Sequence, residues 1–173
     1  MKGISKRKKA ASVFLALIVI GLMIPQPFEN PVDKADKNSF NPKSFWFYPW
    51  GKSGTHKGVD IFAKTGTKVN SSTGGLVLFT GELKMGGKVV LILGPKWRLH
   101  YYAHLNDIQT STLSWTNKGE RIGSVGTSGN AYGKPPHLHY AIVTLIPYTW
   151  RFEKKQQGWK KMFYLNPIVF LTQ

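Results

Sequence analysis

Short apolar runs separated by turn residues recur along most of the chain. They occupy residues 59–62, 76–79, 89–93, 99–103, 122–125 and 138–143. Runs of this length with turn residues between them are typical of antiparallel strands. Gly86 and Gly87 lie between two of the runs and predict a hairpin turn, because glycine accepts the positive φ of tight turns. The pattern predicts a mainly β fold, a compact antiparallel β-sheet domain over residues 45–173, without long amphipathic helices.

The first 24 residues have a different pattern. Five cations precede an uncharged run over residues 10–24, which Pro25 and Pro27 end; they are Lys2, Lys6, Arg7, Lys8 and Lys9. This is the order of a signal peptide, and it predicts one N-terminal hydrophobic helix. No small-x-small cleavage site follows, which favours an uncleaved membrane anchor with its basic end in the cytoplasm. A buried core helix is the alternative, and the adjoining cations argue against it.

Residues 25–44 contain four prolines among Asn, Asp and Lys and have no hydrophobic period. Such a stretch is typical of a linker. We therefore expect the folded domain to begin near Phe45 and to run to the end of the chain. Residues 159–171 are aromatic, basic and apolar without a clear period, and their structure stays open.

Composition limits both the size of the fold and its chemistry. With 173 residues, of which 42% are hydrophobic, the chain can bury one ordinary core. Its 18 glycines and 10 prolines favour short strands joined by turns. The chain has no cysteine, so disulfides, thiolate metal sites and cysteine nucleophiles are excluded. Any metal ion must be held by nitrogen and oxygen.

The charge is strongly positive, with 24 basic and 8 acidic residues and a formal net charge of +16. Such a surface attracts polyanions. We expect no nucleic-acid partner, because an export signal separates the chain from most nucleic acid and no nucleic-acid-binding motif is present. Anionic cell-envelope polymers or lipid headgroups are the better candidates. A basic surface that serves only solubility is the alternative.

The positions of the histidines are the clearest indication of a functional site. The five histidines are at positions 56, 100, 104, 137 and 139. Residues 56, 58 and 60 of an extended chain face one way, so His56 and Asp60 could both be ligands of one metal ion, and Gly58 leaves open space between them. His137 and His139 also share a strand face, roughly 6.6 Å apart. The alternatives are a surface His–Asp pair and two solvent-facing strand histidines.

Two neutral imidazoles and one carboxylate form a typical catalytic zinc set that leaves a fourth position open for water. Zinc lowers the pKa of bound water to about 7, and an unligated histidine nearby can handle the remaining proton. His104 and His137 are the candidates for that role. Manganese or cobalt could occupy similar ligands, so zinc is inferred from the ligand types.

Four blocks in one order carry a family resemblance. They are His56-x-Gly58-x-Asp60, Tyr102-Ala103-His104-Leu105, the glycine-rich residues 123–130, and Pro136-His137-Leu138-His139. Together they resemble the lysostaphin-like (LytM-type) zinc endopeptidases. The resemblance implies that His56, Asp60 and His139 bind zinc and that His104 and His137 are catalytic without binding it. It also implies a compact antiparallel β fold with zinc in a groove, and hydrolysis of peptide bonds in peptidoglycan.

Two positions depart from that pattern or lie outside it. Ala141 follows Tyr140 where relatives commonly have Glu, so efficiency or specificity could differ. His100 matches no motif, and we interpret it as an ordinary polar residue outside the site.

We therefore predict an endopeptidase of the cell envelope that hydrolyses peptide cross-links of peptidoglycan. The alternative is a non-catalytic peptidoglycan-binding or amidase-activating module of the same fold, and the complete ligand set argues against it.

Overall fold

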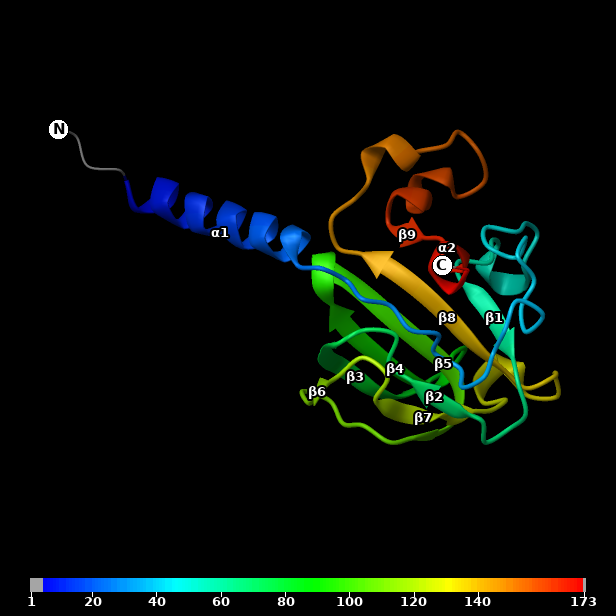
Figure 1. The fold of residues 1–173 in the computed structure, drawn as a ribbon. Coiled ribbons are helices and arrows are strands. Elements are labelled where there is room, and N and C mark those ends of the chain that lie inside the picture. The colour runs from blue at the N-terminus through cyan, green and yellow to red at the C-terminus, as the bar shows by residue number, and fades with distance from the viewer. Residues whose placement is uncertain (1–4, 173) are drawn as a thin grey trace.

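The computed structural model describes residues 5–172, in which an N-terminal helix precedes a nine-stranded antiparallel sheet (Figure 1). The strands are β1 (Val59–Phe62), β2 (Lys68–Asn70), β3 (Gly75–Leu83), β4 (Gly87–Gly94), β5 (Arg98–Ile108), β6 (Trp115–Thr116), β7 (Arg121–Val125), β8 (His137–Thr144) and β9 (Tyr164–Leu165). Six of them follow the order β1-β8-β5-β4-β3-β6; β2 pairs with β7, β7 with β5, and β9 with β8. The predicted mainly β class is confirmed.

The helices are short except for the first. They are α1 (Lys6–Met23), α2 (Ile168–Leu171) and the 3-10 turns η1 (Gly51–Ser53), η2 (Pro95–Trp97), η3 (Gly129–Ala131), η4 (Thr149–Arg151) and η5 (Gly158–Met162). Within residues 24–172 there is thus no long amphipathic helix, as predicted. The C-terminal stretch that the sequence left open contains η5, β9 and α2.

All six predicted apolar runs fall inside strands, namely β1, β3, β4, β5, β7 and β8. The hairpin predicted at Gly86 and Gly87 joins β3 to β4, where Leu83 pairs with Gly87 and Gly87 has a φ of +62°. Strands β2, β6 and β9 were not predicted. They have only three, two and two residues, too few to show an alternating pattern.

Alternation along the strands separates the core from the site. On β8, Leu138, Tyr140 and Ile142 are fully buried in the hydrophobic core, as are Val59 and Ile61 on β1. Residues of a strand alternate between the two faces of the sheet. The intervening residues, among them Asp60, His137 and His139, therefore belong to the other face.

The predicted linker over residues 25–44 is wrong for much of its length. Val32 and Phe40 are buried in the core, and Phe28 packs against it. Val32 also forms a β-bridge with Val69 of β2. The folded domain therefore begins before Phe45. The three apolar side chains that pack this segment against the sheet are irregularly spaced, so the sequence shows no period there.

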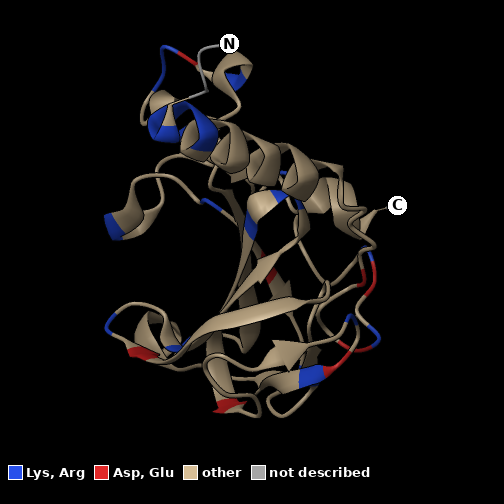
Figure 2. Cartoon of the chain, turned by 90° about the vertical axis from the view of Figure 1, so that its left-hand side faces the viewer, with Lys and Arg blue, Asp and Glu red and all other residues tan. Residues whose placement is uncertain are grey.

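The predicted N-terminal helix is present as α1. Its first turn carries cations, visible as the blue segment of the helix in Figure 2. The helix projects away from the sheet (Figure 1) and contacts the turn η2 near its C-terminal end, where the Trp97 indole N–H donates to the Ile18 carbonyl at 3.1 Å. The expected membrane anchor finds no support here: within residues 5–172, no helix combines the length and the apolar character needed to cross a membrane.

Candidate active site

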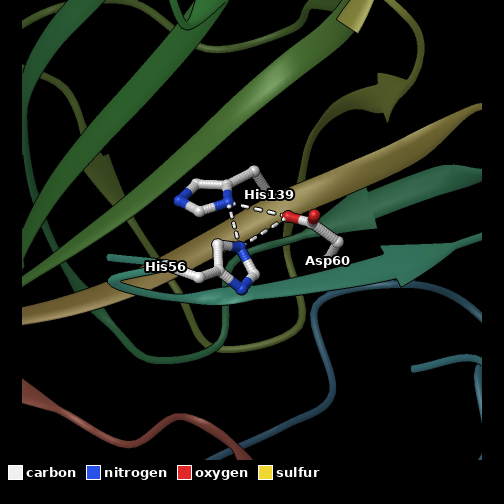
Figure 3. Close-up of side chains that lie close together, drawn as sticks. All are labelled: His56, Asp60 and His139. Atoms are coloured by element: carbon white, nitrogen blue, oxygen red, sulfur yellow. Dashed lines mark hydrogen bonds and ion pairs between the residues drawn. The ribbon is translucent and has the colours of Figure 1, made fainter. Parts of the chain in front are cut away.

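Strands β1 and β8 bring three possible metal donors together. Asp60 stands opposite His139 in the antiparallel register, and Asp60 Oδ1 lies 2.8 Å from His139 Nδ1. His56, which precedes β1, places Nε2 3.1 Å from Asp60 Oδ1 and 3.2 Å from His139 Nδ1 (Figure 3). The three donor atoms lie within 4.8 Å of one another, so a single ion could contact all three.

The ring orientation of His56 suits a metal ligand. Its Nδ1 lies 3.0 Å from the Ser44 carbonyl oxygen, which can only accept, so Nδ1 carries the proton and donates. Nε2 then presents a lone pair to the carboxylate oxygen of Asp60. Two acceptors at this distance repel unless a proton or a metal ion lies between them. The donor set therefore fits a metal ion, and two nitrogens with one oxygen are a set that zinc prefers.

Burial raises the pKa of Asp60, but the His139 and His56 rings, when they carry protons toward this carboxylate, outweigh burial and hold the pKa well below its usual range. The carboxyl group is therefore ionised at neutral pH. An ionised carboxylate is the form that coordinates a metal.

Gly58 makes room for the cluster, as the sequence predicted. A Cβ at this position would lie 2.4 Å from the Tyr140 carbonyl oxygen and 3.0 Å from two atoms of the His139 ring. No side chain fits there without moving β8 or His139.

His104 and His137 lie beside the cluster and share one geometry. Nδ1 of His104 donates to the Ser128 carbonyl at 3.0 Å, and Nδ1 of His137 donates to the Pro135 carbonyl at 2.8 Å. Each neutral ring therefore keeps Nε2 as a proton acceptor. The ring centroids lie 5.1 Å apart, and His137 Nε2 is 4.0 Å from Asp60 Oδ2.

His104 reaches this face because β5 is bulged. Strict alternation would give His104 the face of His100 and Tyr102, but His104 has a φ of +64°, and the pairing of β4 with β5 shifts register between Lys88 and Val90. A bulge redirects a side chain in this way. Burial, together with the charges of His139 and His137, lowers the pKa of His104 to about 4.

His100 lies away from the cluster, in the core. It is fully buried, with Nδ1 2.6 Å from the Tyr140 hydroxyl and Nε2 2.8 Å from Gln26 Nε2. The structure thus brings together His56, Asp60, His104, His137 and His139 and leaves His100 apart.

A groove of about 780 Å³ contains this cluster. Its lining includes Trp50, whose ring stacks on His56 with centroids 4.3 Å apart, and also Tyr101 and Ala141. Neither Trp50 nor Tyr101 was predicted from the sequence to be a groove residue. An aromatic residue in a loop or strand is no sign of a site without the tertiary contacts.

Residues 54–151, more than half of the chain, match the profile of peptidase family M23. The chain belongs to peptidase family M23. The five clustered residues all lie within the matched range. This confirms the family to which the sequence motifs pointed.

Two curated relatives are similar to this M23 chain over part of their length. The L-Ala–D-Glu endopeptidase of Bacillus subtilis (strain 168) is 37% identical over 117 residues, which are 61% of this chain and 35% of the relative. The peptidoglycan DD-endopeptidase ShyA of Vibrio cholerae is 32% identical over 114 residues, which are 65% of this chain and 26% of the relative. The chain thus spans about a third or less of the length of these relatives.

Solved structures confirm the lysostaphin-like fold of the M23 domain. The catalytic domain of lysostaphin from Staphylococcus simulans aligns with a TM-score of 0.61 at 24% identity, covering 79% of this chain and 95% of that one. A zinc-containing peptidase from Vibrio cholerae aligns with a TM-score of 0.56 at 27% identity, covering 67% and 36%.

Proposed function

We propose that this protein is a zinc-dependent endopeptidase that hydrolyses peptide cross-links of bacterial peptidoglycan. The observation that carries the proposal is the groove in which His56, Asp60 and His139 converge while His104 and His137 stand beside them. The relatives named as endopeptidases, one of them explicitly of peptidoglycan, support the same substrate class.

His56, Asp60 and His139 would hold the metal ion. Zinc supplies Lewis acidity toward a carbonyl oxygen and toward water. One carboxylate and two neutral imidazoles leave a net charge of +1 on the centre, which preserves that acidity. The Ser44 carbonyl fixes the His56 ring through Nδ1, as outer hydrogen-bond partners commonly do for metal-binding histidines.

His104 and His137 would move protons during hydrolysis. Their Nδ1–H groups are held by backbone carbonyls, so each Nε2 is oriented toward the groove with a fixed tautomer. One ring accepts the proton that water loses when it attacks the peptide carbonyl. The other ring acts in its imidazolium form, in which Nε2 also carries a proton, and it stabilises the oxyanion or donates that proton to the leaving amine, so the nitrogen does not leave as an anion.

We place the protein in the cell envelope, outside the cytoplasm, because its proposed substrate lies there. The cations before the apolar run of residues 10–24 fit an export signal. The net charge of +16 suits a surface that works among anionic envelope polymers or lipid headgroups.

Two alanine variants test the division of roles. His139→Ala removes a proposed ligand, so it should lose zinc in equilibrium dialysis and lose cleavage of peptidoglycan peptides. His104→Ala should keep close to the wild-type zinc content and lose cleavage by roughly 100-fold or more, the contribution expected of a general acid or base. Full activity of His139→Ala would contradict the proposal.

A further inference from the structure

The C-terminal segment beyond the matched family range reaches back to the groove. Gln157 lies at the start of η5, outside residues 54–151. Its side-chain amide accepts a hydrogen bond from Thr55 Oγ1 at 3.2 Å and donates one from Nε2 to the Ser53 carbonyl at 3.0 Å. One side chain therefore makes two hydrogen bonds to a segment about a hundred residues earlier.

Those contacts fall on residues 50–57, which we call the wall loop. The loop closes on itself through the Trp50 N–H, which donates to the Gly54 carbonyl at 2.8 Å. It carries Trp50 and His56, whose rings stack in the groove. Gly54 has a φ of +75°, and a Cβ there would lie 2.4 Å from Gln157 Nε2. The Gln157 amide thus fills the space that the glycine leaves.

The backbone at Gln157 has a conformation that residues other than glycine seldom adopt. Gln157 has a φ of +54°, in the left-handed region that favours glycine. A residue other than glycine in this region costs free energy, and it persists where the contacts of its side chain offset that cost. The segment that follows Gln157 is also joined to β8, the strand that carries His137 and His139. It forms β9, in which Tyr164 pairs with Val143 of β8.

We propose that Gln157 is a positioning residue: it fixes the wall loop against the C-terminal segment and so holds Trp50 and His56 in place along the groove. The segment after residue 151 then helps to hold the groove residues in position. The effect on catalysis rests on the proposed function, whereas the effect on the order of the wall loop does not.

Gln157→Gly separates this role from general stability. Glycine relieves the left-handed backbone but removes both hydrogen bonds. The matched control is Gln156→Gly, which adds the same backbone freedom at an exposed neighbour. We expect amide hydrogen exchange in residues 50–57 of the full chain to be at least about tenfold faster in Gln157→Gly than in the control. Its melting temperature should be no lower than that of the control.

The kinetic readout on peptidoglycan peptides distinguishes positioning from a chemical role. Gln157→Gly should lower kcat/KM roughly 5- to 10-fold, mostly through KM, because the wall that receives substrate loosens while the proton-moving histidines stay in place. Should wild type and variants all fail to cleave, the proposed function fails, and the exchange measurement still decides the role of Gln157.

Equal exchange of the wall loop in Gln157→Gly and Gln156→Gly overturns the inference. If Gln157→Gly does not fold, Thr55→Val tests the same contact from the other side, since valine keeps the branched shape and loses the hydroxyl donor. Faster exchange of the wall loop in Thr55→Val supports the inference, and unchanged exchange overturns it.

Discussion

The proposed roles of the individual histidine rings depend on the hydrogen-bond partner of the second ring nitrogen. His56, His104 and His137 each direct Nδ1 to a backbone carbonyl, from Ser44, Ser128 and Pro135 respectively. Those carbonyls leave Nε2 for a metal ion or for a proton. The sequence identified the histidines but not these partners. Every residue has a backbone carbonyl, so a sequence motif cannot show which carbonyl accepts the hydrogen bond.

His100 predicts a specific acid sensitivity. Burial, with a smaller effect from the charge of Arg98, lowers the pKa of His100 from 6.5 to about 3. The unfolded chain therefore binds a proton at this residue between pH 6.5 and 3 when the folded chain does not, so folding stability falls as the pH falls through that window. At pH 4 this loss is at most roughly 3 kcal/mol.

His100→Asn removes that titration. The variant should be less stable than wild type at pH 7, because the buried hydrogen bonds of the ring are disturbed. The gap in unfolding free energy should then narrow as the pH is lowered toward 4. Urea unfolding of both proteins at several pH values measures it, and a gap that stays constant from pH 7 to 4 contradicts the burial of a neutral His100.

Pairing between strands distant in sequence builds the site. Antiparallel register places Asp60 of β1 opposite His139 of β8, and Phe62 opposite His137. The sequence predicted both strands and the shared faces of their alternate residues. It could not supply the register between them from local pattern, and it could not place the bulge that turns His104 into the groove, since both depend on non-local hydrogen bonds. The family resemblance, not the pattern, grouped these residues in advance.

Gly58→Ala tests how closely β1 approaches β8. The added Cβ would meet the Tyr140 carbonyl at 2.4 Å, so β8 or His139 must move. We expect a loss of roughly 1–3 kcal/mol in unfolding free energy without metal, the usual cost of overpacking, and a weaker zinc affinity. Gly74→Ala is the matched control, because its Cβ would have no neighbour closer than 3.7 Å. Equal stability of the two variants would show that the strands are not so close.

The folded domain includes more of the chain than the strand pattern predicted. Fold class and most strands followed from the spacing of apolar runs, yet residues 25–44 contribute Val32 and Phe40 to the core. The C-terminal segment adds β9 to the sheet and Gln157 to the wall loop. Residues 25–44 were predicted to be a linker, and the structure of residues 159–171 was left open, because a few separated contacts show no period in the sequence.

Digestion of purified peptidoglycan sacculi by the full chain is the most direct test of the proposed activity. Released peptides are resolved by mass spectrometry, with zinc, with a chelator, and with zinc restored. We predict that cross-linked species convert to uncross-linked ones, that chelation stops the conversion, and that zinc restores it; the products then identify the bond. No conversion with zinc demonstrably bound would contradict the account and favour a non-catalytic wall-binding or activating module.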